Sequence, residues 1–348
     1  QGVLWVQAWG LDRSLWGSAS EAMGQTCGCG AELGTPEEFA DGSSPVKNSA
    51  FVFIKPHAVT KEVQDLVRER LASAGIIVMQ SSQIPAEAID EKGLIDKHYG
   101  AIASRAMLQQ PSELVVQEQA KAEFKSLFGL TWEEALGKGL VYNAKGAAEK
   151  LGVEPLEISN RFDVLKRGKD QIKFGGGFYV GKVDDIYVVN GFYTRMRAKF
   201  TTPGTCIHFF EVLWDPEDLP WQKFRAEIIG ATNPAEAVPG SIRRTIFEKW
   251  QTLGLEGEPN TGDNGVHASA SPFEGLAERA NWLGTQVGKD PFGRALAAAG
   301  VGEPTINEWS SDPPVTFEGK KQSLFDLLED IDAGPCVSKA VQILEANK

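Results

Sequence analysis

Short apolar runs alternate with amphipathic stretches in the first part of the chain. The run AFVFIK at 50–55 is typical of a buried strand. Between Thr60 and Ala74 apolar residues recur at three- and four-residue spacing, which predicts a helix with Thr60 as its N-cap. Residues 76–84 predict a second strand, and 86–99 predict a second helix.

The same alternation returns after residue 205. CIHFFEVLW at 206–214 predicts a strand, and a helix follows from about 218 to 230. The Pro- and Gly-rich stretch 230–250 is interpreted as a long loop. A short strand is expected at 264–268, and a helix at 272–283 that begins with Ser271 as N-cap and proline at its first position.

These elements have the order β-α-β-α-β-α-β-α when residues 108–205 are left out. The first part has the split β-α-β arrangement of ferredoxin-like domains. We therefore predict an α+β fold: a ferredoxin-like βαββαβ sandwich with an antiparallel sheet and helices on one face, interrupted by an α/β insertion.

The segment 108–205 has a different pattern. Helical pieces are expected at 114–127 and 131–150, and two aromatic, β-branched runs joined by a Lys-Val-Asp-Asp turn predict a β-hairpin. The glycines 175–177 lack the spacing of a phosphate-binding loop and lie in strand-like sequence, which favours a β-bulge or a close backbone approach.

Four segments follow from this pattern. Residues 1–47 form a disordered N-terminal tail and linker, rich in polar and turn-forming residues after residue 30. Residues 48–107 together with 206–285 form the sandwich domain, and 108–205 form the insertion. Residues 286–348 form a helical C-terminal extension, with its clearest helix at 323–332, which we expect to pack onto the core.

Composition narrows the functional classes. The chain has 348 residues, of which 42% are hydrophobic and 24% charged, and a net charge of −12. This acidity argues against a nucleic-acid partner, because such proteins usually present a basic face. No apolar run reaches the roughly 18 residues needed to cross a bilayer. The four cysteines, at 27, 29, 206 and 336, form neither a disulfide framework nor a zinc motif, which favours a reducing, cytoplasmic location.

The N-terminal sequence contains a candidate lipidation signal. The chain begins with Gln1, and its first methionine, Met23, is followed by Gly24, an acceptor for myristoylation if translation starts there. Cys27 and Cys29 are candidates for palmitoylation, and two lipids would anchor the protein to a membrane. The alternative is a flexible tail with two exposed thiols.

One of the four histidines, His267, lies among glycine, alanine and serine residues in NGVHASAS. Small neighbours leave room around an imidazole. A nucleophile that reacts with a large group needs such room. Glu278, eleven residues later, is a candidate partner for the ring. The alternative is a core histidine whose ring nitrogens are satisfied by hydrogen bonds.

Four segments, in order, resemble the signature segments of nucleoside diphosphate kinases: FIKPHAV, HYGAIASR, IIGATNPAEAVPGSIR and NGVHASAS with its following glutamate. The resemblance covers 48–107 and 206–285. It implies transfer of the γ-phosphate of a nucleoside triphosphate to a nucleoside diphosphate, in two steps, through a phosphohistidine. Neutral imidazole is a competent nucleophile near neutral pH.

The resemblance also implies roles for individual residues. His267 would be the nucleophile, Glu278 would orient it, and Ser269 would hold Glu278. Lys55 would contact the transferring phosphate with help from Tyr99. The other nucleotide contacts would be Arg105, Thr232 and Arg243 to phosphates, Asn264 to the ribose, and residue 107, here Met107, to the base. Mg²⁺ would ride on the nucleotide, with no protein ligand.

Taken singly, several of these residues have an ordinary alternative. Lys55 and Arg105 could be solvated cations, and Thr232 could be a helix or turn cap.

The sequence departs from the family pattern at several positions. His57 stands where an aspartate is usual, and Met107 where an aromatic residue is expected. Ala226 replaces an arginine; Arg225 could substitute only if the helix shifts register, because one residue turns a helix by about 100°. Arg244 stands where the family has glycine and is another candidate for the missing cation.

The sequence therefore predicts a nucleoside diphosphate kinase that binds nucleoside tri- and diphosphates. The alternative is a catalytically weak scaffold or targeting protein that binds nucleotides or partners. The resemblance also implies homo-oligomers assembled through the proline-rich loop at about 232–250.

Overall fold

A computed structural model describes residues 46–175 and 177–348. The predicted tail, including Gly24, Cys27 and Cys29, lies outside the described residues except at its last two positions. Within the described ranges, no helix combines the length and apolar character that a membrane crossing requires.

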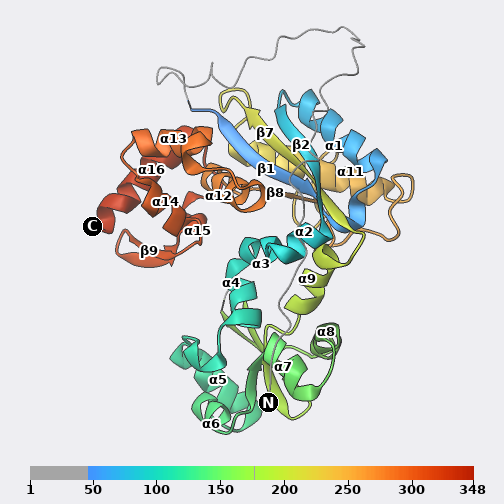
Figure 1. The fold of residues 1–348 in the computed structure, drawn as a ribbon, viewed down its shortest axis with the longest axis vertical. Helices are drawn as coiled ribbons and strands as arrows, with labels where there is room; N and C mark the ends of the chain where they lie inside the picture. Colours follow the sequence, from blue (N-terminus) through green and yellow to red (C-terminus); the bar gives the residue numbers. More distant parts are fainter. Residues whose placement is uncertain (1–45, 176) are drawn as a thin grey trace, which may run out of the picture. The chain divides into compact units, whose positions relative to one another are not determined.

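The first sheet contains four strands in the order β2-β7-β1-β8 (Figure 1). They are β1 (Asn48–Ile54), β2 (Ile77–Pro85), β7 (Cys206–Trp214) and β8 (Val266–Ala268). All neighbouring pairs are antiparallel. Because β7 separates β1 from β2, the predicted split arrangement and antiparallel sheet are confirmed.

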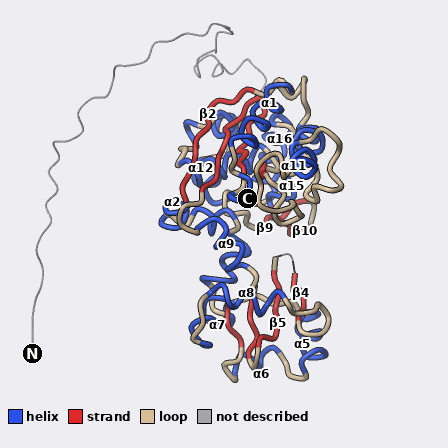
Figure 2. Tube along the Cα trace, turned by 90° about the vertical axis from the view of Figure 1, so that its right-hand side faces the viewer, coloured by secondary structure: helices blue, strands red, loops and turns tan. Residues whose placement is uncertain are grey.

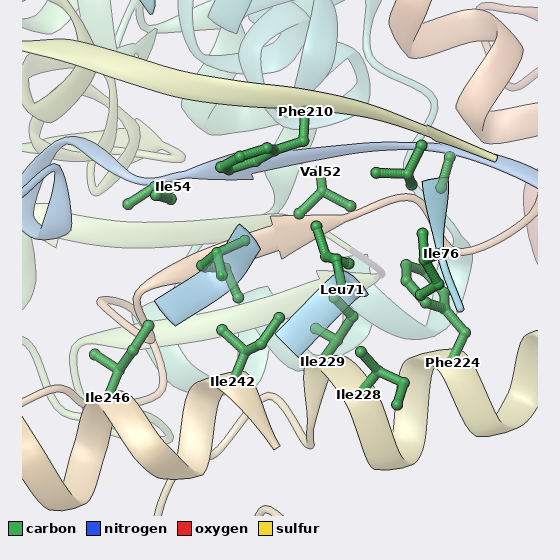
Figure 3. Packing of buried hydrophobic residues seen from close by; sticks show 14 of the residues in the cluster. Val52, Ile54, Leu71, Ile76, Phe210, Phe224, Ile228, Ile229, Ile242 and Ile246 are labelled. Atoms are coloured by element: carbon green, nitrogen blue, oxygen red, sulfur yellow. The ribbon is translucent and has the colours of Figure 1, made fainter. Parts of the chain in front are cut away.

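Both faces of this sheet are covered by helices, so the expectation of helices on one face is wrong. Val52 and Ile54 of β1 pack in a core that includes α1 (Lys61–Ser73) and α11 (Ile242–Lys249). Figure 3 shows Ile242 and Ile246 pointing from α11 toward the strands. The alternate residues, Phe51 and Phe53, pack in a second core on the opposite face. Every residue of β1 is buried, as a strand between two helical layers requires.

The second core places three short helical elements and α12 against the sheet. It contains Ile89 of α2 (Ala86–Glu91), Leu94 and Ile95 of α3 (Leu94–His98), Phe200 of α9 (Tyr193–Thr201) and Trp282 of α12 (Pro272–Leu283). The predicted helix 86–99 is divided at Gly93, whose φ of 59° favours glycine.

The helix ends that frame the site follow local sequence signals. Thr60 accepts a hydrogen bond from the N–H of Val63 at 3.1 Å and starts α1. Ser271 accepts one from the N–H of Glu274 at 3.0 Å and starts α12, which also has the predicted bounds. The expected loop 230–250 is partly helical, because it contains α11.

Residues within the predicted insertion form a second sheet, in the order β3-β6-β5-β4 (Figure 2). Its strands are β3 (Val141–Asn143), β4 (Gln171–Gly175), β5 (Phe178–Val183) and β6 (Ile186–Val189). The β5–β6 hairpin is as predicted, and a register shift between Lys173 and Gly175 confirms the bulge.

The expected helix 131–150 is interrupted by β3, which pairs parallel with β6. The helices around this sheet are α5 (Glu118–Phe128), α6 (Trp132–Gly137), α7 (Ala144–Leu151) and α8 (Pro155–Asp163). The segment 108–205 does not pack as one unit, because Phe200 of α9 belongs to the core of the first sheet.

The C-terminal residues form a helical cluster with a small β-hairpin. Its elements are α13 (Pro291–Ala298), α14 (Glu303–Trp309), β9 (Pro314–Phe317), β10 (Lys320–Ser323), α15 (Leu324–Leu328) and α16 (Ala333–Ala346). The cluster packs against α12 through Phe273 and Leu276. The predicted helix 323–332 ends earlier, at Leu328.

Candidate active site

His267 lies on the short edge strand β8, where the backbone of β1 fixes its position. It is directly opposite Phe53 in the register, and the two rings stack with centroids 4.7 Å apart. The side chain is 18% exposed, so the ring is not fully enclosed by the protein. The strand pairing and the stacked Phe53 ring hold the imidazole in place.

Glu278 on α12 holds the other side of this ring. Its Oε1 lies 2.5 Å from Nε2 of His267. Burial alone would raise the pKa of Glu278, but the electrostatic interaction with His267 and the hydrogen bond from its ring outweigh burial and lower the pKa. An ionised carboxylate only accepts hydrogen bonds, so Nε2 carries the proton and Nδ1 carries the lone pair. This tautomer makes Nδ1 the nucleophilic nitrogen.

Ser269 fixes the carboxylate from its other oxygen. Its Oγ donates to Oε2 of Glu278 at 2.6 Å and accepts from the backbone N–H of Phe51 at 2.9 Å. Ser269 is fully buried and Glu278 is only 5% exposed. The structure thus brings together the three residues predicted to form the nucleophile and its support.

His98, at the end of α3, is a site residue that sequence reasoning missed. Its Nδ1 lies 3.4 Å from Oε1 of Glu278, and its ring meets that of His267 edge-on with centroids 4.6 Å apart. Burial and then the charge of His267 lower the pKa of His98 to about 3, so it stays neutral at physiological pH. A signal was present, because His98 directly precedes Tyr99 in HYGAIASR.

The same three side chains are also a potential metal-binding group. Ligand atoms of His98, His267 and Glu278 lie within 4.8 Å of one another. Two imidazoles and one carboxylate suit zinc or another transition metal better than Mg²⁺, which prefers oxygen. The hydrogen bond between His267 and Glu278 already accounts for their proximity.

Lys55 and Arg243 supply positive charge beside the imidazole. Lys55 follows β1, and its Nζ donates to the carbonyl of Gly262 at 3.0 Å. Burial and then the nearby charge of Arg243 lower the pKa of Lys55 to about 8. The positive charges of Lys55 and Arg243 repel each other in a partly buried environment. A bound anion would relieve this repulsion.

Arg243 on α11 is oriented by backbone carbonyls on either side. It donates to Gly230 at 2.8 Å and to Val266, the residue before His267, at 3.0 Å. Burial and then the charge of Arg225 lower the pKa of Arg243 to about 10. Tyr99 is near the same groups: burial and then the charge of Glu278 raise its pKa to about 12.

Asn264 and Thr232 meet near the start of β8. Nδ2 of Asn264 donates to the carbonyl of Thr232 at 3.0 Å. Oδ1 of Asn264 is buried and has no hydrogen-bond partner among the described residues. A buried acceptor without a donor is costly, and a hydroxyl of a bound ligand would satisfy it. Thr232 itself is exposed.

The structure places Arg105 and Met107 differently from their expected roles. The guanidinium of Arg105 lies over the ring of Phe178 in the second sheet, 5.1 Å from its centroid, and donates to the carbonyl of Ala101 at 3.1 Å. Met107 is partly buried in the core beside the same sheet. The roles that the resemblance implies for Arg105 and Met107 stay predictions.

The helical segment that carries Arg225 has a π-helical turn. The helix α10 (Trp221–Lys223) continues into η4 (Phe224–Ile229), which has π-helical geometry. The N–H of Gly230 bonds to the carbonyl of Arg225, five residues earlier, at 2.9 Å. A π-turn accommodates one extra residue, which is the difference between Arg225 and the expected position.

The other two departures have local explanations. Arg244 donates to Glu248 at 2.6 Å and to the carbonyl of Ala235, so its guanidinium is engaged along α11 and the preceding loop. His57 accepts from the N–H of Gly265 at 3.3 Å, and burial lowers its pKa to about 4. His57 thus supports the backbone two residues before His267.

The chain is similar to the structure of the nucleoside diphosphate kinase from Encephalitozoon cuniculi, with 14% identity over 69% of this chain and 90% of that chain and a TM-score of 0.34. It is similar to an NDP kinase from Pyrobaculum aerophilum with 18% identity, coverage of 68% and 95%, and a TM-score of 0.32. No protein-family model and no curated protein matches the sequence.

Proposed function

We propose that this chain is a nucleoside diphosphate kinase that works through phosphorylation of His267. The observation that carries the proposal is the hydrogen bond of 2.5 Å from Nε2 of His267 to Glu278. It leaves Nδ1 without a bond to Glu278 on a ring that is 18% exposed. Lys55 and Arg243 bond to the backbone just before His267, at the carbonyls of Gly265 and Val266.

In the first step, Nδ1 of His267 attacks the γ-phosphorus of a nucleoside triphosphate. A nitrogen–phosphorus bond forms as the bond from phosphorus to the β–γ bridging oxygen breaks, and the diphosphate leaves with that electron pair. The imidazole becomes positively charged, and Glu278 stabilises the charge through the Nε2 proton. In the second step a terminal oxygen of another nucleoside diphosphate attacks the same phosphorus, and Nδ1 regains its lone pair.

Lys55 and Arg243 would neutralise the charge of the phosphates during both steps. Phosphoryl transfer depends largely on positioning and on such charge stabilisation. Mg²⁺ would enter as part of the substrate, bound to phosphate oxygens, because cations and imidazoles surround His267 where Mg²⁺ would require oxygen ligands. Oδ1 of Asn264 is buried and has no hydrogen-bond partner among the described residues, so it is the candidate to accept a hydrogen bond from a ribose hydroxyl.

One observation favours the second candidate, a nucleotide-binding scaffold with weak turnover. The guanidinium of Arg225, the candidate replacement for the arginine of the family pattern, is bonded to Glu329 and Asp330 of the C-terminal segment. A scaffold would bind ADP without exchanging phosphate. Membrane anchoring through Gly24, Cys27 and Cys29, and assembly into homo-oligomers, remain proposals that belong equally to either function.

A coupled assay for ATP-dependent phosphorylation of a deoxynucleoside diphosphate tests the proposal. We expect turnover that His267→Ala abolishes. His208→Leu is the matched control, because it replaces a histidine in the same sheet, on β7. ADP binding without any turnover by the unmodified chain would favour the scaffold.

A further inference from the structure

Arg225 is bound by two carboxylates from a distant part of the chain. Its Nη1 donates to Oε1 of Glu329 at 2.7 Å and to Oδ1 of Asp330 at 2.6 Å. The two acids directly follow α15 and are more than a hundred residues away in sequence. Although burial lowers the pKa of Arg225, these hydrogen bonds outweigh burial and raise it.

The segment that carries these acids is anchored on both sides. Leu328 before them is fully buried in the C-terminal core. Oδ1 of Asp332 after them accepts from Nδ2 of Asn48 and from the N–H of Trp221, each at 2.7 Å. The N–H of Asp330 bonds at 3.0 Å to the carbonyl of Ala270, three residues after His267. The acids are therefore held beside the site by the fold.

Their side chains are nevertheless partly exposed, so a competing anion can reach them. The side chain of Glu329 is 44% exposed, that of Asp330 is 42% exposed, and that of Arg225 is 32% exposed. Exposed ion pairs contribute little to stability, so a competing anion can replace them. Phosphate and carboxylate oxygens bind a guanidinium with the same geometry.

Arg225 also lies close enough to the candidate phosphate site to influence it. Its charge is the second largest cause of the lowered pKa of Arg243, after burial. Arg243 contacts the residue before His267. Any polyphosphate held by Arg243 thus comes within the electrostatic reach of Arg225.

We propose that Glu329 and Asp330 form an acidic latch, which holds Arg225 in the ligand-free protein and is displaced by the phosphates of a bound nucleotide. The proposal rests on the proposed function for the identity of the ligand. The latch lowers nucleotide affinity, because each binding event must first separate Arg225 from its two carboxylates. The C-terminal extension thereby acts as a built-in competitor.

Titration calorimetry with ADP and Mg²⁺ at low salt tests the latch. In the double variant Glu329→Gln with Asp330→Asn we expect ADP to bind about three- to tenfold more tightly, the range set by two exposed ion pairs. Asparagine suits position 330, where φ is +59°. Adding Arg225→Ala to this variant should remove the gain. The single variants and thermal melts separate this effect from misfolding.

Glu308→Gln with Glu345→Gln is the matched control, since it removes the same charge from exposed positions of the same extension. The control should leave ADP affinity near that of the unmodified chain. Unchanged or weaker ADP binding in the latch variant would overturn the proposal. A complete lack of ADP binding by the unmodified chain and all variants would also overturn it. Tighter binding without any phosphohistidine would retain the latch and remove the kinase function, so the two failures are distinguishable.

Discussion

His267 owes its chemistry to groups that never touch substrate. Glu278 fixes the tautomer, and Ser269 fixes Glu278 while also bonding the backbone of β1. In such a chain of hydrogen bonds, the group farthest from the ring acts only by positioning the others.

Ser269→Ala should therefore lower kcat by about ten- to a hundredfold, because one hydrogen bond that orients the base partner is lost. KM for ADP should change little, because Ser269 contacts no phosphate. The free energy of unfolding should fall by about 1–2 kcal/mol, the usual loss when a buried hydrogen bond is removed. Steady-state kinetics and urea unfolding measure both effects. A rise in KM with kcat unchanged would assign Ser269 a direct binding role instead.

Lys55 gives the site a specific pH dependence. Its pKa of about 8 in the ligand-free protein should rise when an anion binds, because phosphate favours the charged ammonium. Affinity for ADP should thus be greatest below pH 8 and decline between about pH 8 and 9.5. Calorimetry at several pH values measures the decline.

Lys55→Arg provides the control, because a guanidinium remains charged over this range. That variant should show a flatter profile. If its decline matches that of the unmodified chain, another group controls the pH dependence.

At this scale the sequence identified residues whose partners are close along the chain. Glu278 is a candidate partner of His267 from its position eleven residues later, whereas the role of Ser269 is implied by the family resemblance. His98 and the acids that bind Arg225 could not be found in the same way. Their contacts with the site depend on how distant elements pack.

Among the elements, β8 positions His267 through the tight turn before it. Gly265 has φ of +87°, its carbonyl accepts from the N–H of Lys55 at 2.9 Å, and its N–H reaches His57. A Cβ atom at this position would come within 2.7 Å of Ile246 on α11. The turn therefore links β1, β8 and α11.

Gly265→Ala should destabilise the protein by about 1–3 kcal/mol more than Gly254→Ala. Both glycines have positive φ, and the backbone strain is therefore similar. At Gly254 the new Cβ would meet Thr60 at an ordinary 3.6 Å, without the overpacking expected at Gly265. Urea denaturation measures the free energy of unfolding of both variants. Equal losses would show that the side chain of Ile246 moves aside without an energetic cost.

Elements with local signals were predicted, and those set by tertiary context were not. Thr60 and Ser271 are N-caps whose identity marks a helix start, and α12 has the predicted bounds. The π-turn of η4 has no such signature, because it reflects one extra residue between two packed ends. Likewise β3 is a strand because it pairs with β6, more than forty residues later.

In the molecule as a whole, a buried ion pair joins α12 to the C-terminal elements. The side chains of Arg279 and Asp290 are fully buried, and Nε of Arg279 donates to Oδ2 of Asp290 at 2.7 Å. Oδ1 of Asp290 accepts from the N–H groups of Phe292 and Gly293 and starts α13. Glu211 is farther from Arg279, at 3.8 Å.

Asp290→Asn should cost about 3–5 kcal/mol, because it leaves the guanidinium of Arg279 buried without its charged partner. Adding Arg279→Met should recover part of this loss, since the unpaired charge is then absent. Chemical unfolding of both variants tests the expectation. A single variant as stable as the unmodified chain would show that Glu211 compensates fully.

The most direct test of the central claim is to detect phosphate on His267. After incubation with γ-labelled ATP and Mg²⁺, the chain should carry label that is stable to alkali and lost in acid, as expected for phosphohistidine. Subsequent addition of unlabelled nucleoside diphosphate should transfer the label to the nucleotide. Absence of label, or label that persists in His267→Ala, would contradict the account.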